Sequence, residues 1–243
     1  MRALITGSSH GLGRELARSF IDAGWTVTGT THNLANINEM EQYKYFQFDP
    51  MEDPALAVSN LVNQLSVVPY DLLINNAGVN AIRPFKDLDA EFIQEIMNVN
   101  FMAPVLLVRD MLDQRLLAKP AIVINIISDA AWRPMRHSLA YNCSKAALDM
   151  ATKQMARELT KPEKLTVVGI RPGKMHGTEM SRYIDDSVCR MRGWSQEQAF
   201  EYWMQNSVSG VEIQPEKLAD TICHLVSSGM VYAMSGACVD LAG

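Results

Sequence analysis

Tyr141 and Lys145 stand four residues apart, at the start of a helical pattern in the run Tyr-Asn-Cys-Ser-Lys. At this spacing two side chains share one face of a helix and lie about 5–6 Å apart at Cβ. A positive charge beside a phenol favours the phenolate, so we expect Lys145, together with a second positive charge on a bound ligand, to lower the pKa of Tyr141 toward neutral pH. Such a tyrosine could donate or accept a proton in a reaction. Taken alone the spacing is common by chance, and an exposed helical pair is the alternative interpretation.

Two further polar residues lie where they could serve the same reaction. Ser128 follows the apolar run Ala121–Ile127, which is typical of a buried strand, and precedes Tyr141 by thirteen residues. Ligands of open α/β sheets bind outside the carboxyl ends of the strands, so the Ser128 hydroxyl could polarise a substrate carbonyl there. Without a site, it would simply form a turn. Asn100 lies inside a helical pattern, where an asparagine indicates a local irregularity in hydrogen bonding.

A glycine-rich turn, Gly-Ser-Ser-His-Gly-Leu-Gly at residues 7–13, follows the first expected strand and opens a helix. Glycines let backbone N–H groups approach a pyrophosphate, which the positive end of the helix dipole also attracts. We therefore predict a dinucleotide site; the alternative is a strand-to-helix connection that binds nothing. The residues expected to contact the cofactor here are Gly7, Ser9, His10, Gly11, Leu12 and Gly13.

These groups need a sheet whose strand ends meet at one edge. Short apolar runs alternate with longer helical patterns, and that order predicts a parallel sheet covered by helices on both faces. We predict an α/β fold of the doubly wound (Rossmann) type, a three-layer sandwich with a seven-stranded parallel sheet, in a single domain over residues 1–243. Strands are expected at Ala3–Thr6, Thr26–Thr30, Tyr45–Phe48, Leu72–Asn75, Ala121–Ile127, Thr166–Ile170 and Ala237–Leu241. Helices are expected near Gly13–Ala23, Pro54–Leu65, Ala90–Leu117, Leu139–Leu159 and Pro215–Ser227.

The segment His176–Gln214 interrupts this alternation. It is polar and carries arginine, tyrosine, tryptophan and methionine residues between the sixth strand and the next helix. A connection of this length is usually functional, so we predict a substrate lid near residues 176–214. Its composition permits either an acidic or an aromatic ligand. Asn80–Ile82, Trp132 and Met135 are further candidates for the pocket wall, with simple packing as the alternative for Trp132 and Met135.

The turn Thr-Gly-x-x-x-Gly-x-Gly at residues 6–13, with the tyrosine–lysine pair and the serine ahead of it, resembles the short-chain dehydrogenase/reductase family, which includes carbonyl and 3-oxoacyl reductases. The resemblance covers essentially the whole chain. It implies an oxidoreductase that transfers a hydride between a nicotinamide and a carbonyl or alcohol substrate without a metal. It also implies that Tyr141 is the general acid or base and that Lys145 binds ribose hydroxyls. The implied catalytic residues are Asn100, Ser128, Tyr141 and Lys145.

The same resemblance implies cofactor contacts beyond the glycine turn. Asp49 matches an acidic residue that hydrogen-bonds the adenine amine, and Thr178 matches a threonine that contacts the carboxamide. Residues 174–177 make the connection before Thr178 one residue longer than in many relatives. The further implied contacts are Thr31, His32, Asp49, Asn76, Ala77, Gly78, Tyr141, Lys145, Pro172, Gly173, Met175 and Thr178.

NADP(H) is expected in preference to NAD(H). A carboxylate at the end of the second strand would bind both hydroxyls of the adenine ribose and would repel a 2′-phosphate. The run Thr28–Asn33 contains no acidic residue, and Thr31, His32 and His10 offer a hydroxyl and two imidazoles instead. Because neither position holds Arg or Lys and histidines are mostly neutral at pH 7, the expected preference is moderate.

Composition argues against several other classes of protein. A net charge of -5 provides no basic surface for nucleic acid, and no apolar run is long enough to span a membrane. The chain starts directly with a strand pattern rather than a secretion signal, so we expect a cytoplasmic location. The four cysteines show no metal-ligand spacing, so we expect no metal site. The expected partners are a small-molecule carbonyl or alcohol substrate and, by the resemblance, further copies of the chain in a homodimer or homotetramer.

A catalytically silent NAD(P)-binding sensor or scaffold of the same fold is the alternative function. The intact set Asn100, Ser128, Tyr141 and Lys145 argues against it. Binding of reduced cofactor without turnover on a broad carbonyl panel would favour it.

Overall fold

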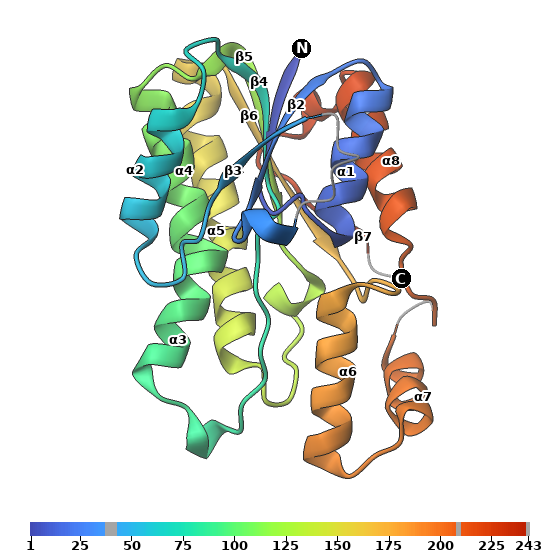
Figure 1. Ribbon diagram of the computed structural model, residues 1–243. Helices are drawn as coiled ribbons and strands as arrows, with labels where there is room; N and C mark the ends of the chain where they lie inside the picture. Colours follow the sequence, from blue (N-terminus) through green and yellow to red (C-terminus); the bar gives the residue numbers. More distant parts are fainter. Residues whose placement is uncertain (37–42, 208–209, 242–243) are drawn as a thin grey trace.

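The computed structural model describes residues 1–36, 43–207 and 210–241, and within them a parallel seven-stranded sheet forms the centre of the molecule (Figure 1). The strand order is β3-β2-β1-β4-β5-β6-β7, so the chain starts in the middle and winds outward in both directions. This confirms the doubly wound, seven-stranded fold. The strands are β1 (Arg2–Ile5), β2 (Thr26–Thr31), β3 (Lys44–Gln47), β4 (Tyr70–Asn75), β5 (Leu117–Ile126), β6 (Leu165–Pro172) and β7 (Cys238–Leu241).

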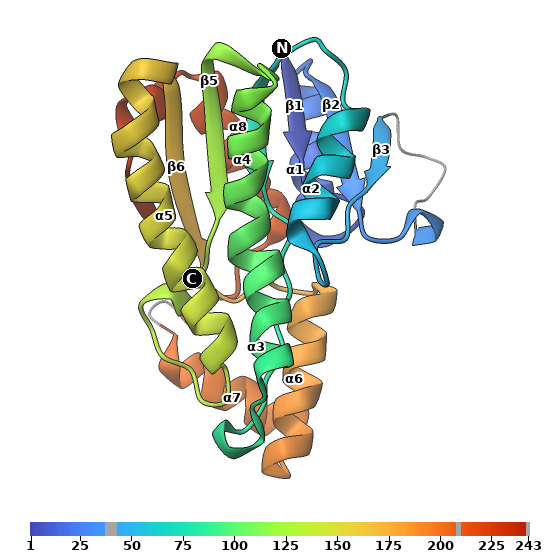
Figure 2. The same ribbon diagram turned by 90° about the vertical axis from the view of Figure 1, so that its left-hand side faces the viewer.

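Helices cover both faces of the sheet and make it a three-layer sandwich (Figures 1 and 2). One outer layer consists of α1 (Gly11–Asp22) and α8 (Pro215–Ser227), and the other of α2 (Pro54–Gln64), α4 (Ala103–Asp113) and α5 (Leu139–Glu163). The central strands are apolar on both faces because each face is covered: Leu72, Leu73 and Ile74 of β4 are fully buried.

The expected continuous helix over Ala90–Leu117 is wrong in its middle and at its end. The structure has α3 (Ala90–Met97), a π-helical turn η3 (Asn98–Met102) and then α4. Pro104 has no N–H for the carbonyl of Asn100, four residues earlier, and the Ala103 N–H bonds back to Asn98 O instead. The regular α-helical hydrogen bonding is therefore interrupted around Asn100. The helix α4 ends at Asp113, and β5 begins at Leu117, earlier than the expected Ala121.

The segment His176–Gln214 forms two helices, α6 (Glu179–Arg192) and α7 (Gln196–Asn206), which lie beyond the carboxyl edge of the sheet (Figure 1). Thr178 caps α6 by accepting a hydrogen bond from Ser181 N at 3.1 Å. Ser195 and Gln198 form a capping box at the start of α7. Residues 208 and 209 of the predicted lid lie outside the described part of the chain.

The base of this helical pair is attached to the strand that precedes it. Met175 forms a parallel β-bridge with Ile213, and His176 N donates to Ile213 O at 2.8 Å. Both ends of the excursion thus meet beside β6. The pair α6–α7 is positioned over the strand ends where a ligand of this fold would lie.

Candidate active site

A cavity of about 590 Å³ opens at the carboxyl edge of the sheet. Its wall is built from the glycine turn, the segments that follow β3, β4, β5 and β6, the start of α5, and the helices α6 and α7. Ser128, Tyr141 and Lys145 all line it, together with the glycine turn. Three of the four residues predicted to do chemistry and most of those predicted to bind a dinucleotide therefore share one space.

The glycine turn is shaped by close backbone approaches. A Cβ on Gly7 would lie 2.8 Å from Ala77 Cα, and one on Gly13 would lie 2.1 Å from Gly7 O. Asn76 holds the turn by donating from Nδ2 to Thr6 O and Gly7 O, each at 2.9 Å. With α1 starting at Gly11, this bare cradle of backbone amides at a helix N-terminus fits a pyrophosphate.

Most of the predicted cofactor residues line the cavity, and two do not. Ser9 and Thr31 are turned toward each other: Thr31 is buried and its Oγ1 lies 3.2 Å from Ser9 Oγ. The predicted direct contact of the Thr31 hydroxyl with a 2′-phosphate is therefore not available in this arrangement. Those that line the wall are Gly7, His10, Gly11, Leu12, Gly13, His32, Asp49, Asn76, Ala77, Gly78, Tyr141, Lys145, Pro172, Gly173, Met175 and Thr178.

Glu179 is a neighbour of the glycine turn that sequence reasoning missed. Its carboxylate lies 3.3 Å from His10 Nε2, and both side chains are largely exposed at the cavity wall. The pair places a negative charge beside one of the two histidines predicted to face the phosphate of NADP(H). Nothing in the spacing of the two residues, far apart in the chain, could have indicated this contact.

Asn100 is fully buried behind the cavity wall in the π-helical turn. Its Oδ1 accepts from Val79 N at 2.9 Å, and its Nδ2 donates to Val79 O at 2.9 Å and to Ser144 Oγ at 3.0 Å. A Cβ on Gly78 would lie 3.3 Å from Asn100 Oδ1 and 3.4 Å from Lys145 Nζ. Asn100 thus ties the segment after β4 to α5 close to the lysine.

Lys145 is buried, and its Nζ donates to Ile126 O at 2.9 Å. Burial lowers the pKa of Lys145 to about 8, because the charged form loses hydration. The ammonium lies 5.9 Å from the centre of the Tyr141 ring. The lysine and the tyrosine share one face of α5, as their spacing predicts.

The expected lowering of the Tyr141 pKa counted two positive charges, Lys145 and a bound nicotinamide cation, and the groups of the protein alone do not produce it. Burial raises the pKa of Tyr141 to about 12; a hydrogen bond with Ser128 opposes this rise, and the charge of Asp129 adds to it. The expectation counted the positive charges and left out both the loss of hydration and the neighbouring carboxylate. At neutral pH the phenol is therefore protonated and suited to donate a proton.

Asp129, directly after Ser128, is the second residue that sequence reasoning missed. Ser128 Oγ donates to Asp129 Oδ1 at 3.1 Å and accepts from Ala130 N at 3.2 Å. Burial raises the pKa of Asp129, and its nearest cation, Arg133, lies 4.0 Å away. The sequence offered one indication of this contact: a carboxylate directly follows the predicted catalytic serine at the end of a strand.

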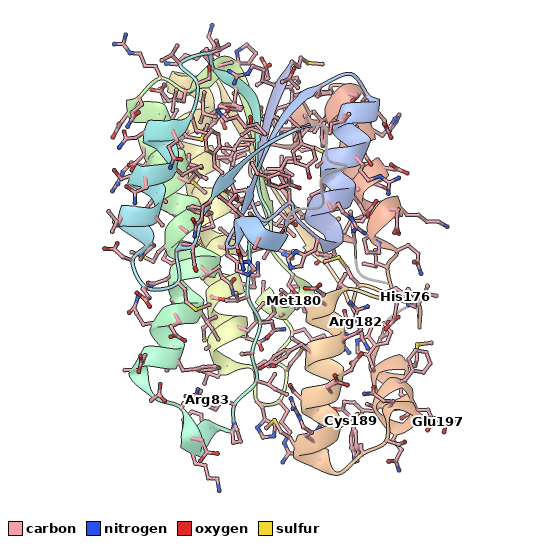
Figure 3. The ribbon with its side chains drawn as sticks, in the orientation of Figure 1. Arg83, His176, Met180, Arg182, Cys189 and Glu197 are labelled. Carbon is pink, nitrogen blue, oxygen red and sulfur yellow. The ribbon has the colours of Figure 1, made fainter. Side chains whose placement is uncertain are left out.

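The rest of the wall comes from the segments predicted to surround a substrate. Asn80, Ile82 and Met135 line the cavity, whereas Trp132 is 57% exposed and donates from Nε1 to Asp240 at 3.1 Å. Trp132 therefore lies outside the cavity wall as the structure describes it. One face of α6 lines the cavity, including Met180, and Figure 3 shows Met180 on the opposite side of the helix from Arg182.

In the described residues, no group of His, Cys, Asp and Glu could hold a metal ion. Over the same residues, no helix is both long and apolar enough to cross a membrane.

Comparison with known proteins gives consistent results for sequence and structure. Residues 1–188 match the model of the family described as short chain dehydrogenase. The chain is 32% identical to D-erythrulose reductase of Gallus gallus over 177 residues, which are 70% of each chain. It is 30% identical to L-xylulose reductase of Mus musculus over 240 residues, 94% of this chain and 91% of the relative. A short chain dehydrogenase family protein of Francisella tularensis superposes with a TM-score of 0.88 at 22% identity, covering 99% of this chain and 96% of that one.

Proposed function

The chain belongs to the short-chain dehydrogenase family, and from this premise we propose that it is an NAD(P)(H)-dependent oxidoreductase that interconverts a carbonyl and an alcohol on a small polar substrate. The observation that carries the proposal is the shared cavity, in which Ser128, Tyr141 and Lys145 lie with the glycine turn. The named activities of the two relatives, reduction of L-xylulose and of D-erythrulose, support a polar carbonyl compound as substrate.

The residues of this chain would divide the work as follows. Bound nicotinamide supplies or takes up the hydride. In reduction, Tyr141 donates a proton to the carbonyl oxygen, and its raised pKa keeps that proton in place at neutral pH. Ser128 holds the same oxygen by its hydroxyl. Lys145 binds ribose hydroxyls, and Asn100, joined to α5 through Ser144, fixes the segment beside it.

We propose NADP(H) as the preferred cofactor. The end of β2, Thr31-His32-Asn33, contains no carboxylate to bind the ribose hydroxyls or repel a 2′-phosphate, and His32 lines the cavity. His10 lies at the same end, where its contact with Glu179 limits what it can give to a phosphate. The preference is therefore expected to be modest.

The proposal includes the cellular location of the enzyme, its oligomeric state and a substrate lid. A cytoplasmic location is supported by the four cysteines, all free. A homodimer or homotetramer is proposed from the family and is tested by light scattering at micromolar concentration. The helices α6 and α7 are proposed as a substrate lid, since they carry one wall of the cavity.

The test is a panel of ketoses, other ketones and aldehydes, and alcohols, read by nicotinamide absorbance with each cofactor. We expect turnover of at least one polar carbonyl compound. Tyr141→Phe should bind reduced cofactor as the parent does and lose most of its turnover, because only the hydroxyl is removed. Lys145→Met should weaken both cofactor binding and turnover. Cofactor binding with no turnover on the whole panel would favour a sensor, and full activity of Tyr141→Phe would refute the assigned acid.

A further inference from the structure

Two arginines on the cavity wall have no acidic partner. Arg136 lies in the segment before α5, and Arg192 is the last residue of α6. Within residues 1–36, 43–207 and 210–241, no carboxylate oxygen lies within 4.0 Å of either guanidinium. Both charges therefore face a space that a ligand can enter.

The other cations of the wall are already engaged. Lys174 Nζ lies 2.9 Å from Asp185 and 3.1 Å from Glu212. Lys145 is bound to a backbone carbonyl, and Arg133 lies 4.0 Å from Asp129. Among the described residues of the wall, the arginine and lysine charges that no carboxylate offsets are thus those of Lys145, at the catalytic end, and of Arg136 and Arg192.

The two arginines lie on the wall of one cavity, although they come from different elements. Loss of hydration lowers the pKa of His137, and the charges of Arg136 and of Arg192 lower it further. A ligand in this cavity would therefore meet the positive charge of both side chains.

Arg192 is held in place by aromatic rings rather than by a carboxylate. Its Cζ lies 4.5 Å from the centre of the Trp194 ring and 4.7 Å from that of Tyr202. Stacking fixes the plane of the guanidinium and leaves N–H donors at its edge for planar oxyanions. An arginine that is oriented but not neutralised is suited to ligand recognition.

We propose that Arg136 and Arg192 bind an anionic group, a carboxylate or a phosphate ester, at the end of the substrate remote from its reacting carbonyl. This inference rests on the proposed oxidoreductase function and names its substrate class. Asp129, beside Ser128, requires the anionic group of the substrate to lie away from its reacting carbon. An anion next to that carbon would be repelled by the Asp129 carboxylate. The substrate is therefore an oxo or hydroxy compound whose anionic group is separated from the reacting carbon, not a 2-hydroxy acid.

Matched substrates test the proposal by kinetics. The parent protein should reduce 5-oxohexanoate with at least about tenfold higher kcat/KM than its uncharged methyl ester, or dihydroxyacetone phosphate with the same advantage over dihydroxyacetone, as loss of a charge-assisted hydrogen bond implies. An advantage in the first pair identifies the anionic group as a carboxylate, and an advantage in the second pair identifies it as a phosphate ester. Arg136→Met/Arg192→Met should abolish the advantage while leaving turnover of the uncharged substrates unchanged. Methionine keeps an apolar stem against the rings.

The control variant is Arg190→Met, on the same helix but outside the cavity wall, where Arg190 donates to Ser187 Oγ at 3.2 Å. It should retain the full advantage of the anionic substrate. Equal use of charged and uncharged partners by the parent protein would overturn the proposal, as would an advantage that survives in the double variant. Melting temperature and NADPH affinity, unchanged in the variants, show that the fold and the cofactor site are intact.

A binding measurement separates failure of this inference from failure of the proposed function. Calorimetry with glutarate and with uncharged glutaramide, each added to the protein–NADPH complex, needs no turnover. Tighter binding of glutarate that disappears in the double variant supports the anion site even if no carbonyl compound is reduced. Equal binding of the two compounds, together with equal turnover of the matched substrates, refutes it while leaving the oxidoreductase assignment standing.

Discussion

Ser128 donates its hydroxyl hydrogen bond to Asp129, at 3.1 Å between Oγ and Oδ1. The hydroxyl proposed to hold the substrate oxygen thus has an acceptor of its own within the cavity wall. Asp129 also raises the pKa of Tyr141 by its charge. One carboxylate therefore influences both hydroxyl groups of the proposed reaction.

Asp129→Asn should move the pH profile of alcohol oxidation to lower pH. In oxidation Tyr141 must first lose its proton, and removal of the neighbouring negative charge lowers the pKa of that phenol. The asparagine keeps the size of the side chain and can still accept from Ser128. The measurement is kcat/KM for the alcohol between pH 6 and pH 10, with Asp87→Asn, at the remote turn Phe85–Asp87, as control. A profile that does not move in Asp129→Asn would contradict the coupling.

The parallel, doubly wound sheet and the sharing of one cavity followed from simple patterns in the sequence. Each strand is a short apolar run, and in a doubly wound sheet the carboxyl ends of such runs meet at one edge. Ser128, at the end of β5, and Tyr141 and Lys145, one helical turn apart on α5, therefore had to come together. Local spacing was sufficient because each of these residues lies at a fixed point of an element.

The electrostatics of the site could not be predicted in this way. The pKa of Tyr141 depends on burial, and burial arises from packing of several elements that no local pattern describes. The contact of His10 with Glu179 joins the glycine turn to α6 across the cavity. Thr31 looked available at a strand end, yet it is buried against Ser9. The pKa of Tyr141, the contact of His10 and the burial of Thr31 all depend on side-chain direction and on contacts between residues far apart in the chain.

Asn100→Ala should destabilise the fold as well as reduce activity. The side chain makes three buried hydrogen bonds, two to the backbone of Val79 and one to Ser144, and their loss leaves buried polar groups without partners. The expected decrease in the free energy of unfolding is about 1–3 kcal/mol. Urea unfolding measures it, and Asn63→Ala, at an exposed position of α2, should change the free energy of unfolding by less than about 0.5 kcal/mol. Equal midpoints for the parent and Asn100→Ala would contradict the structural role.

Glu212→Gln should loosen the attachment of α6 and α7 and make that attachment less sensitive to acid. Burial opposes ionisation of Glu212, but hydrogen bonds from His176 and Lys174 prevail and hold its pKa below the ordinary value of 4.5. A carboxylate whose pKa is lowered by folding stabilises the folded state at pH above its ordinary pKa, and that contribution is lost as the pH falls through the lowered value. The parent should therefore become more sensitive to proteolysis near Gly193 as the pH falls below 4.5.

The glutamine variant should show increased cleavage already at pH 7, with a smaller further increase in acid, since its side chain does not titrate. Glu201→Gln, at an exposed position of α7, is the control. Cleavage of Glu212→Gln that follows the parent at every pH would show that this carboxylate does not hold the two helices.

Glu179→Gln should strengthen the preference for NADP(H) over NAD(H). The Glu179 carboxylate lies 3.3 Å from His10 Nε2, so it competes with a 2′-phosphate for that imidazole and repels the phosphate itself. Because both side chains are largely exposed, the interaction is screened by solvent, and the expected gain in the ratio of kcat/KM values is only about two- to fivefold.

His10→Ala should lower the same ratio of kcat/KM with NADP(H) to kcat/KM with NAD(H). Low salt should enlarge the effect of Glu179→Gln, since screening weakens interactions between exposed charges. The ratio is measured for the parent protein and both variants in one buffer at constant pH. An unchanged ratio in both variants would remove His10 and Glu179 from cofactor selection and leave that role to His32.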